Sequence, residues 1–220
     1  MVSATDDVRQ RLPDVQLRWA ILAREDPPAE AGKPAPAAIE QARQRSLDEV
    51  GADPIAETYR SFFWAVDVDP TKRRPAGEAL ARRSSEGGLP EIHPLVDSYN
   101  RASAATLVAL SAFDRDALAG ELTLDVADED EALDALGEAD PVQPVGDQPV
   151  WRDDEGLVGL SAYRDGQRTA LSADSRQAIV VALAPDEVSS ERVAEAFTLT
   201  EQLAEPAGWH VDEATTRRLG

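Results

Sequence analysis

Two helical segments, each opened by a proline, flank a glycine pair in the middle of this sequence. Pro75 begins the first helix and Gly87-Gly88 ends it, whereas His93-Pro94 begins the second, which is expected to run towards Leu110. Proline suits the first turn of a helix because the N–H groups there have no partner within the helix, and glycine suits the position just past the end. The middle of the chain is therefore predicted to be helical on both sides of a Gly-Gly stop.

By its three- and four-residue spacing, the second helix has two faces. The inner face is predicted to hold Leu95, Tyr99, Thr106 and Leu110. The other face is predicted to hold Asp97, Asn100, Arg101 and Ala104. An ion pair between Asp97 and Arg101, four residues apart, is the plain explanation of this second face.

A strand and a loop are predicted near the start of the chain. Residues 14–25 alternate in polarity, which predicts a half-buried strand. Its buried face would hold Val15, Leu17, Trp19 and Ile21. Residues 27–36 carry four prolines and are expected to form a loop.

Two helices are predicted between this loop and the proline-opened pair. Residues 37–50 are expected to form a helix that ends at a left-handed Gly51. Asp53 is expected to cap the next helix, with Pro54 in its first turn. The apolar stripe of that helix recurs at helical spacing and is expected to lie in the core. It comprises Ile55, Tyr59, Phe62, Phe63 and Val66.

From residue 121 the pattern changes to short strands and turns. Strands are predicted at 122–126, 149–152, 157–163, 168–171 and 178–184. Residues 189–205 are expected to form a further helix, followed by a tail around Trp209. Helices, then strands, then a closing helix are typical of an α+β fold. The sequence thus predicts a single α+β domain over residues 1–220, with helices packed on mixed or antiparallel sheets.

The chain is strongly acidic, with a formal net charge of −20 and only two lysines, Lys33 and Lys72. This excess of acid with so little lysine favours adaptation to a salt-rich cytoplasm, because molar salt shortens the Debye length to about 3 Å and screens self-repulsion. The alternative is an acidic surface that binds cations or basic proteins.

Composition also excludes several classes of site. The absence of cysteine excludes disulfides, thiolate catalysis and cysteine-ligated zinc. No apolar run reaches the roughly 18 residues of a membrane span, so we expect a soluble, cytoplasmic protein without a membrane or DNA partner. No phosphate-binding loop or dinucleotide fingerprint is present. The acidic run from Asp128 to Glu131 is most simply a solvated turn, so neither a cofactor nor a metal is expected.

A basic cluster stands out against this acidity. It consists of Lys72, Arg73, Arg74, Arg82 and Arg83. One reading is contact with the phosphates of RNA, which cationic side chains provide without reading sequence. The other reading is local: cations in the last turn of a helix offset its negative end by roughly 0.3–1 kcal/mol, and the remaining ones pair with nearby acids. Both readings remain open at this point. The two histidines, His93 and His210, lie at predicted element ends, where capping or surface roles are expected.

Three motifs around this cluster resemble one known domain. They are PTKRRPAGEAL, LP-x-I-x-x-LVDSYN-x-x-S and AFD. Together they resemble the B3/B4 domain of the phenylalanyl-tRNA synthetase beta subunit, and above all the free-standing proteins that carry only that domain. The motif-bearing part covers residues 53–184, and the C-terminal helix and tail cover 189–220. The resemblance implies binding of tRNA or aminoacyl-tRNA, with hydrolysis of a wrongly attached amino acid in trans.

The same resemblance assigns expected roles to individual residues. Asn100 matches the asparagine of the V-D-x-T-N motif, which lines the editing pocket of the synthetase, while Tyr99 replaces its threonine. Ser111 stands where that family carries its editing histidine, and residues 178–183 lack the expected glutamate. The obvious groups for activating water are thus missing, although a tRNA hydroxyl could assist the reaction. The expected substrate-binding residues are Asp97, Asn100, Ser103, Ser111, Arg164 and Thr169.

Two other functions remain open from the sequence. The first is a non-catalytic module that binds an amino-acid-like ligand without RNA. The second is a domain that serves only in protein assembly. A cationic patch beside the pocket would favour RNA, whereas a closed pocket in acidic surroundings would favour the small ligand.

The charge predicts a salt-dependent fold. At 10 mM ionic strength the twenty uncompensated negative charges repel one another over about 30 Å. We expect the melting temperature to rise as potassium chloride increases from about 10 mM to 2 M. A melting temperature that stays flat over this range would contradict the adaptation to high salt.

Overall fold

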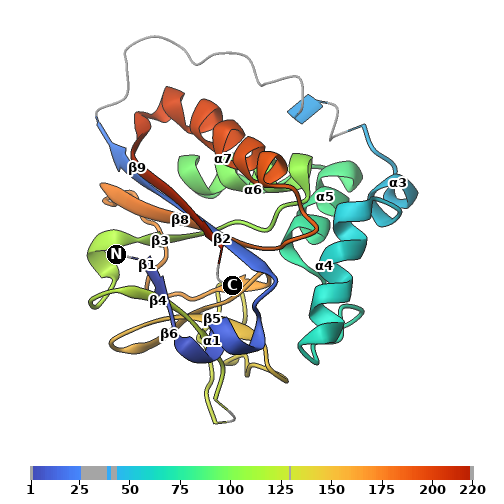
Figure 1. Cartoon of the computed structure of the whole chain (residues 1–220). Coiled ribbons are helices and arrows are strands. Elements are labelled where there is room, and N and C mark those ends of the chain that lie inside the picture. The colour runs from blue at the N-terminus through green and yellow to red at the C-terminus, as the bar shows by residue number, and fades with distance from the viewer. Residues whose placement is uncertain (1, 26–38, 41–43, 129, 219–220) are drawn as a thin grey trace.

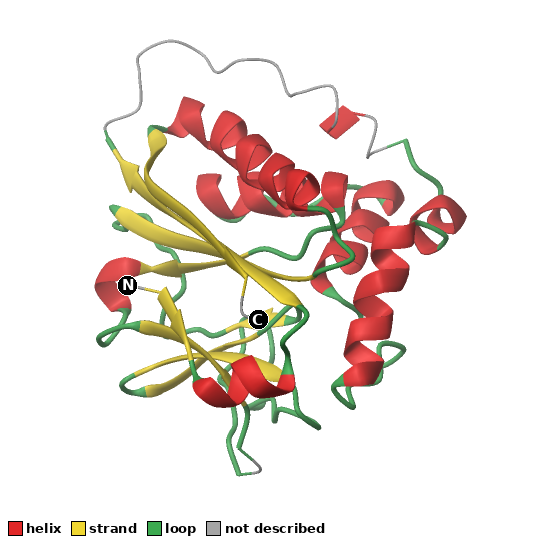
Figure 2. Ribbon diagram, viewed as in Figure 1, coloured by secondary structure: helices red, strands yellow, loops and turns green. Residues whose placement is uncertain are grey.

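The structure is a computed structural model that describes residues 2–25, 39–40, 44–128 and 130–218. It is an α+β fold, as predicted, with helices packed against two sheets (Figures 1 and 2). The predicted loop at 27–36 lies outside the described residues. None of the described helices is long and apolar enough to cross a membrane.

The first sheet has four antiparallel strands in the order β3-β8-β2-β9. Their bounds are β2 Val15–Arg24, β3 Ser111–Asp114, β8 Gln177–Pro185 and β9 Trp209–Arg218. Strand β2 is central and is buried on both faces, so the prediction of a half-buried strand was wrong. Gln16, expected on the exposed face, is only 1% exposed and donates to the carbonyl of Val188. Arg18 lies over the ring of Phe197.

The second sheet has the order β1-β4-β5-β6-β7. Its strands are β1 Val2–Ala4, β4 Leu122–Val126, β5 Pro149–Asp153, β6 Gly156–Leu160 and β7 Arg164–Asp165. Strand β1 runs parallel to β4, and the other pairs are antiparallel. Phe113 of β3 and Trp151 of β5 join the two sheets, with their ring centroids 6.3 Å apart. The core is therefore continuous between the sheets.

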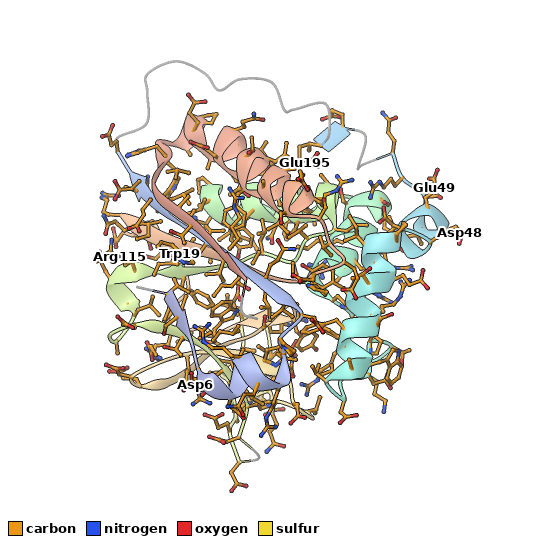
Figure 3. The ribbon with its side chains drawn as sticks, viewed as in Figure 1. Asp6, Trp19, Asp48, Glu49, Arg115 and Glu195 are labelled. Atoms are coloured by element: carbon orange, nitrogen blue, oxygen red, sulfur yellow. The ribbon has the colours of Figure 1, made fainter. Side chains whose placement is uncertain are left out.

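Helices cover one face and one end of the first sheet, whereas α1 (Asp6–Arg11) contacts β4 of the second sheet. The bounds of the others are α3 Leu47–Gly51, α4 Pro54–Ala65, α5 Ala76–Glu86, α6 Pro94–Thr106 and α7 Ser190–Ala204. Figure 1 shows α6 and α7 side by side over the four-stranded sheet, with α3, α4 and α5 grouped beyond one end of it. Asp6, Asp48, Glu49 and Glu195 are exposed on their helices, whereas Trp19 of β2 is buried (Figure 3).

Most predicted helix ends are confirmed. Asp53 caps α4 through a bond from the amide of Ile55, and Ser189 caps α7. The stripe on α4 is buried at Tyr59, Phe62, Phe63 and Val66, with Ile55 partly buried. His93 caps α6, where its Nδ1 accepts from the amide of Leu95. Helix α6 ends at Thr106, four residues earlier than predicted, because Leu107 turns into the left-handed region.

Several sequence-based boundaries were wrong, and one of them is the strand predicted at 157–163, which ends at Leu160. Residues 44–46 interrupt the helix predicted at 37–50, because Ser46 caps a new helix in a reciprocal pair with Glu49, and Gly51 belongs to that helix. Residues 168–171, predicted to form a strand, do not form one; the short strand β7 lies just before them, at Arg164–Asp165. The predicted tail around Trp209 is strand β9, which pairs with β2.

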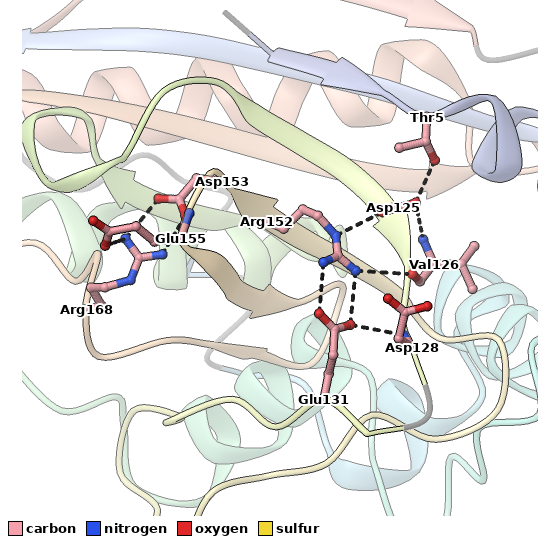
Figure 4. A network of polar contacts seen from close by, with 9 residues as sticks. All are labelled: Thr5, Asp125, Val126, Asp128, Glu131, Arg152, Asp153, Glu155 and Arg168. Carbon is pink, nitrogen blue, oxygen red and sulfur yellow. Dashed lines mark hydrogen bonds and ion pairs between the residues drawn. The ribbon is translucent and has the colours of Figure 1, made fainter.

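Two arginines cross-link the second sheet (Figure 4). Arg152 pairs with Asp125 at 2.9 Å and with Glu131 at 2.8 Å. Glu131 was expected in a solvated turn and instead takes part in this pair. Arg168 pairs with the buried Asp153 at 2.6 Å. Burial raises the pKa of Asp153, but hydrogen bonds from Arg168 and two backbone amides outweigh this, so its pKa lies below the ordinary value.

The start of α5 touches the end of α6 backbone to backbone. A Cβ atom on Gly77 would overlap the carbonyl oxygen of Leu107. Leu107 has φ 63° and leads the chain out of α6. The hydroxyl of Ser103 fixes this turn by donating to the carbonyl of Val108 and accepting from the amide of Leu110. The chain then enters β3 at Ser111 in a fixed direction.

Because of this contact, replacing a helical glycine with alanine is expected to destabilise the protein here, whereas it normally stabilises a helix. Alanine in a helix normally stabilises by roughly 1 kcal/mol over glycine. At Gly77 the overlap with Leu107 should reverse this, and we expect Gly77→Ala to lower the free energy of unfolding by about 1–3 kcal/mol. Gly87→Ala is the control, because nothing lies within 4 Å of a Cβ there. Denaturant unfolding measures both, and a stabilised Gly77→Ala variant would contradict the contact.

Candidate ligand-binding site

The residues of interest converge where β7 of the second sheet meets β3 of the first. Strand β7 pairs with β6, with Asp165 opposite Gly159. Ser111, the first residue of β3, faces Asp165 from the neighbouring sheet, as does the amide of Ala112. Tyr99 of α6 lies close enough for Asp165 to affect its titration. Three elements distant in sequence thus place a carboxylate, a phenol and a hydroxyl together.

Asp165 is the most perturbed acid of this group. Its Oδ1 is buried and accepts no hydrogen bond within 3.5 Å from the part of the chain that the structure describes, although the residue as a whole is partly exposed. Burial raises the pKa of Asp165 to about 6, against the smaller opposing effects of Ser111, Ala112 and Arg164. Burial also raises the pKa of Tyr99, and the charges of Asp165 and Asp97 raise it further. The electrostatic environment of Tyr99 is therefore negative.

The predicted residues of α6 take different places. Asp97 is used locally, because its Oδ1 accepts from the amide of Ile92 at 2.9 Å. Asn100 is partly exposed, next in sequence to Tyr99. Ser103 is fully buried, and its hydroxyl is occupied by the turn that follows α6. Local hydrogen bonds thus occupy Asp97 and Ser103, which leaves Asn100 as the member of this set to consider for contact with a ligand.

The predicted residues of the second half also differ. Ser111 is buried beside Asp165, as described. Thr169 is fully buried, and its hydroxyl has no hydrogen-bond partner among the described residues. Arg164 is exposed and pairs with Glu138 at 3.1 Å. Its charge is thus already offset, which weakens its expected role in binding an anionic group.

The basic cluster is divided between structural and exposed positions. Arg74 and Arg82 both approach the buried Glu78, at 3.6 Å and 3.0 Å. Arg60 of α4 approaches the same carboxylate at 3.0 Å. Lys72 is exposed and lies 3.7 Å from Asp69. Arg83 is exposed near the end of α5. Much of the cluster therefore serves the packing of α4 and α5.

Arg73 is the exception, because it points towards the candidate site. Its guanidinium lies 5.5 Å from the ring centroid of Tyr163, and that of Arg164 lies 5.3 Å from the same ring. Arg73 also donates to the side chain of Gln148 and to the carbonyl of Gln143. Tyr163 thus links the basic cluster to β7, and Arg164 is next in sequence to Asp165. This arrangement could not be inferred from sequence spacing, since Arg73 and Tyr163 are ninety residues apart.

Elsewhere the described structure has a cavity and a histidine with a perturbed pKa, but no cluster of metal ligands. A cavity of about 590 Å³ opens between the α1–β2 turn and α4, floored by Leu12, Val15 and Phe62 and edged by Asp14, Glu57 and Glu187. No group of three or more His, Cys, Asp or Glu side chains in the described residues is arranged to hold a metal ion. Burial, together with the charge of Arg24, lowers the pKa of the capping His93.

The raised pKa of Asp165 predicts a pH-dependent stability difference. The unfolded pKa is near 3.9, so the folded state binds the proton more tightly, and ionisation above pH 6 penalises folding by about 2–3 kcal/mol. This penalty disappears as the pH falls through 6 towards 4. We expect Asp165→Asn to be more stable than the parent at pH 7.5, by up to about 2 kcal/mol, and the gain to shrink below about 1 kcal/mol at pH 4.5. Denaturant unfolding at both values tests this, and equal differences would contradict a raised pKa.

Comparison with known proteins found the following similarities. Residues 58–218 match the B3/4 domain family. Over 120 residues the chain is 25% identical to the phenylalanine–tRNA ligase beta subunit of Tropheryma whipplei (strain Twist), a match that covers 54% of this chain and 12% of the ligase subunit. An N-terminal fragment of the phenylalanyl-tRNA synthetase beta subunit from Pyrococcus horikoshii aligns with a TM-score of 0.48 and 12% identity, over 98% of this chain and 53% of the fragment.

The chain thus spans about one eighth of the length of the curated ligase subunit and about half of the solved fragment. The family match is much broader, because it extends from α4 through β9 and includes α5, α6, β3, β7 and β8. Asn100, Ser111 and Asp165 all fall within it. Since the match covers well over half of its length, this chain belongs to the B3/4 domain family.

Proposed function

We propose that this chain recognises the aminoacylated 3′ end of a tRNA. The observation that carries the proposal is the contiguity of two surfaces. Arg73 and Arg164 both lie over the ring of Tyr163, with their guanidinium carbons 5.5 Å and 5.3 Å from its centroid. Arg164 is followed directly in β7 by Asp165. A cationic, aromatic surface beside a small polar site suits a phosphate–ribose end that carries an amino acid.

Asn100 is the residue of α6 proposed to contact the bound group. It is partly exposed, unlike Ser103, and follows Tyr99, which lies near Asp165. Its side chain offers both a donor and an acceptor, which suits an ester carbonyl or a ribose hydroxyl. This assignment agrees with the resemblance of its motif to the pocket of the synthetase.

Hydrolysis of a wrongly attached amino acid in trans is the finer part of this proposal. Ser111 replaces the histidine that the resemblance implies, and His93, whose Nδ1 caps a helix, is committed elsewhere. Activation of water would then fall to a hydroxyl of the terminal ribose. The relation to a tRNA ligase subunit supports the choice of substrate class.

A second candidate is a module that binds a small amino-acid-like ligand without RNA. The observation in its favour is that Lys72, Arg74 and Arg82 are all near carboxylates, so few cations are left for phosphate. High salt would weaken phosphate contacts further, because counterion release contributes little there.

Binding of charged tRNA to two variants and a control tests the proposal. We expect Asn100→Ala to weaken binding of aminoacyl-tRNA by about fivefold to a hundredfold, through loss of a hydrogen bond worth roughly 1–3 kcal/mol. Arg73→Ala should weaken charged and uncharged tRNA alike and lower the salt slope by about 1. Arg115→Ala is the control, since Arg115, like Arg73, is bonded to a glutamine, Gln177, but is exposed and lies in the turn after β3 (Figure 3).

The outcomes separate the two candidates. If Arg73→Ala binds tRNA as tightly as the parent does, and amino-acid amides bind without any RNA, the small-ligand module would be favoured. Unchanged affinity in a folded Asn100→Ala variant would remove that residue from the site. Hydrolysis is measured as deacylation of a panel of mischarged tRNAs at molar potassium chloride. A sample without protein gives the spontaneous rate.

A further inference from the structure

Asp165 presents an unused acceptor at the junction of the two sheets. Its Oδ1 is buried without a hydrogen-bond donor among the described residues, while the residue keeps some accessible surface. Ser111, the amide of Ala112 and the charge of Arg164 offset part of the cost of burying this carboxylate. The unpartnered Oδ1 adds a further cost, and such an atom is normally retained where something else compensates it. Neither cross-linking arginine of the second sheet supplies this compensation, because Arg152 and Arg168 are bound to other acids.

Charged groups near Asp165 come from α6, from β7 and from residues 134–138, where the amide of Leu136 donates to the backbone carbonyl of Asp165 and the acids are Asp134 and Glu138. From α6 these are Tyr99 and, through Tyr99, the carboxylate of Asp97. From β7 it is Arg164, which lies against Tyr163 and is paired with Glu138. Strand β3 contributes the uncharged Ser111. Three acids and one neutralised cation therefore define the local charge, which is negative.

We propose that Asp165 binds the α-ammonium group of an aminoacyl ester, and that the site rejects the free amino acid. This inference rests on the proposed recognition of a charged tRNA end and names the group by which the amino acid is held. An ammonium group brings a positive charge and up to three donors, one of which could bond the Oδ1 of Asp165, the oxygen without a donor among the described residues.

Rejection of the free amino acid follows from the same charges. In a free amino acid the carboxylate is attached to the carbon that carries the ammonium group, so it would enter the field of Asp165 and Asp97. Like charges this close repel, and Arg164, the cation whose charge acts on Asp165, is already paired with Glu138. In the ester this carboxylate is absent. The site would thus distinguish the attached amino acid from the free one, which is abundant in any cell.

Protonation provides an independent signature. The pKa of Asp165 is raised to about 6 by burial, and the protonated acid cannot form an ion pair. Affinity for a ligand that carries an ammonium group should therefore be full near pH 7.5 and fall below pH 6. A ligand without that group should show no such decline.

The test uses amides, which keep the ammonium group, lack the carboxylate and are resistant to hydrolysis. The probes are the amides of L-phenylalanine, L-tyrosine, L-leucine and L-alanine, with the N-acetyl amide and the free acid of each, measured by calorimetry in molar potassium chloride. For the amide bound best, we expect N-acetylation and Asp165→Asn each to weaken binding by about tenfold to a hundredfold. The free acid should bind at least about tenfold more weakly than the amide. Asp140→Asn, which removes an exposed acid, should leave affinity unchanged.

Each result bears on the inference. Equal affinity for amide and N-acetyl amide, or an unaffected Asp165→Asn variant that melts as a folded protein, would overturn it. Charged tRNA that binds more tightly than uncharged tRNA, with no effect of Asp165→Asn, would leave the proposed function standing and overturn the ammonium contact. If neither amides nor charged tRNA bind to the parent, the proposed function itself fails and this inference fails with it.

Discussion

The backbone contact between Gly77 and Leu107 is the constraint on which the site depends. It allows the start of α5 to meet the end of α6 without an intervening side chain. The hydroxyl of Ser103 then holds the following turn from inside. Because β3 begins four residues after Leu107, this junction fixes where Ser111 enters the first sheet. The approach of Ser111 to β7 is thus a consequence of helix packing some distance away.

Charge is distributed unevenly between interior and surface. The chain has about twice as many acids as bases, yet three arginines surround one buried carboxylate, Glu78. Arginine suits this role because its planar fork contacts several acceptors at once and stays charged when partly buried. In the second sheet, Arg152 pairs with Glu131 and Arg168 pairs with Asp153 (Figure 4). Five arginines therefore hold acids within the fold, whereas Arg73 contacts neutral groups beside the candidate site.

The sequence was most informative where structure is local. Helices α4 to α7 follow from capping residues and apolar spacing, since both are written within one turn of the helix. Strand β9 was missed because the alternation of Trp209 and Val211 with polar residues stops after Asp212, and the rest of the strand is held by pairing with β2. Asp165 was missed for a related reason: its environment is made by Tyr99 and Ser111, more than fifty residues earlier. Only the Asp-Gly pair at 165–166 hinted at a turn-like position there.

The position of β2 has a consequence for synthesis of the protein. Its two hydrogen-bonded neighbours are β8 and β9, and the nearer of them begins about 150 residues after β2 ends. At typical elongation rates the ribosome needs roughly 10–30 s to supply that partner. During this time an apolar strand, destined to be buried on both faces, has no sheet to join. The yield of folded molecules then depends on how well the nascent chain is shielded while the rest of it is still being made.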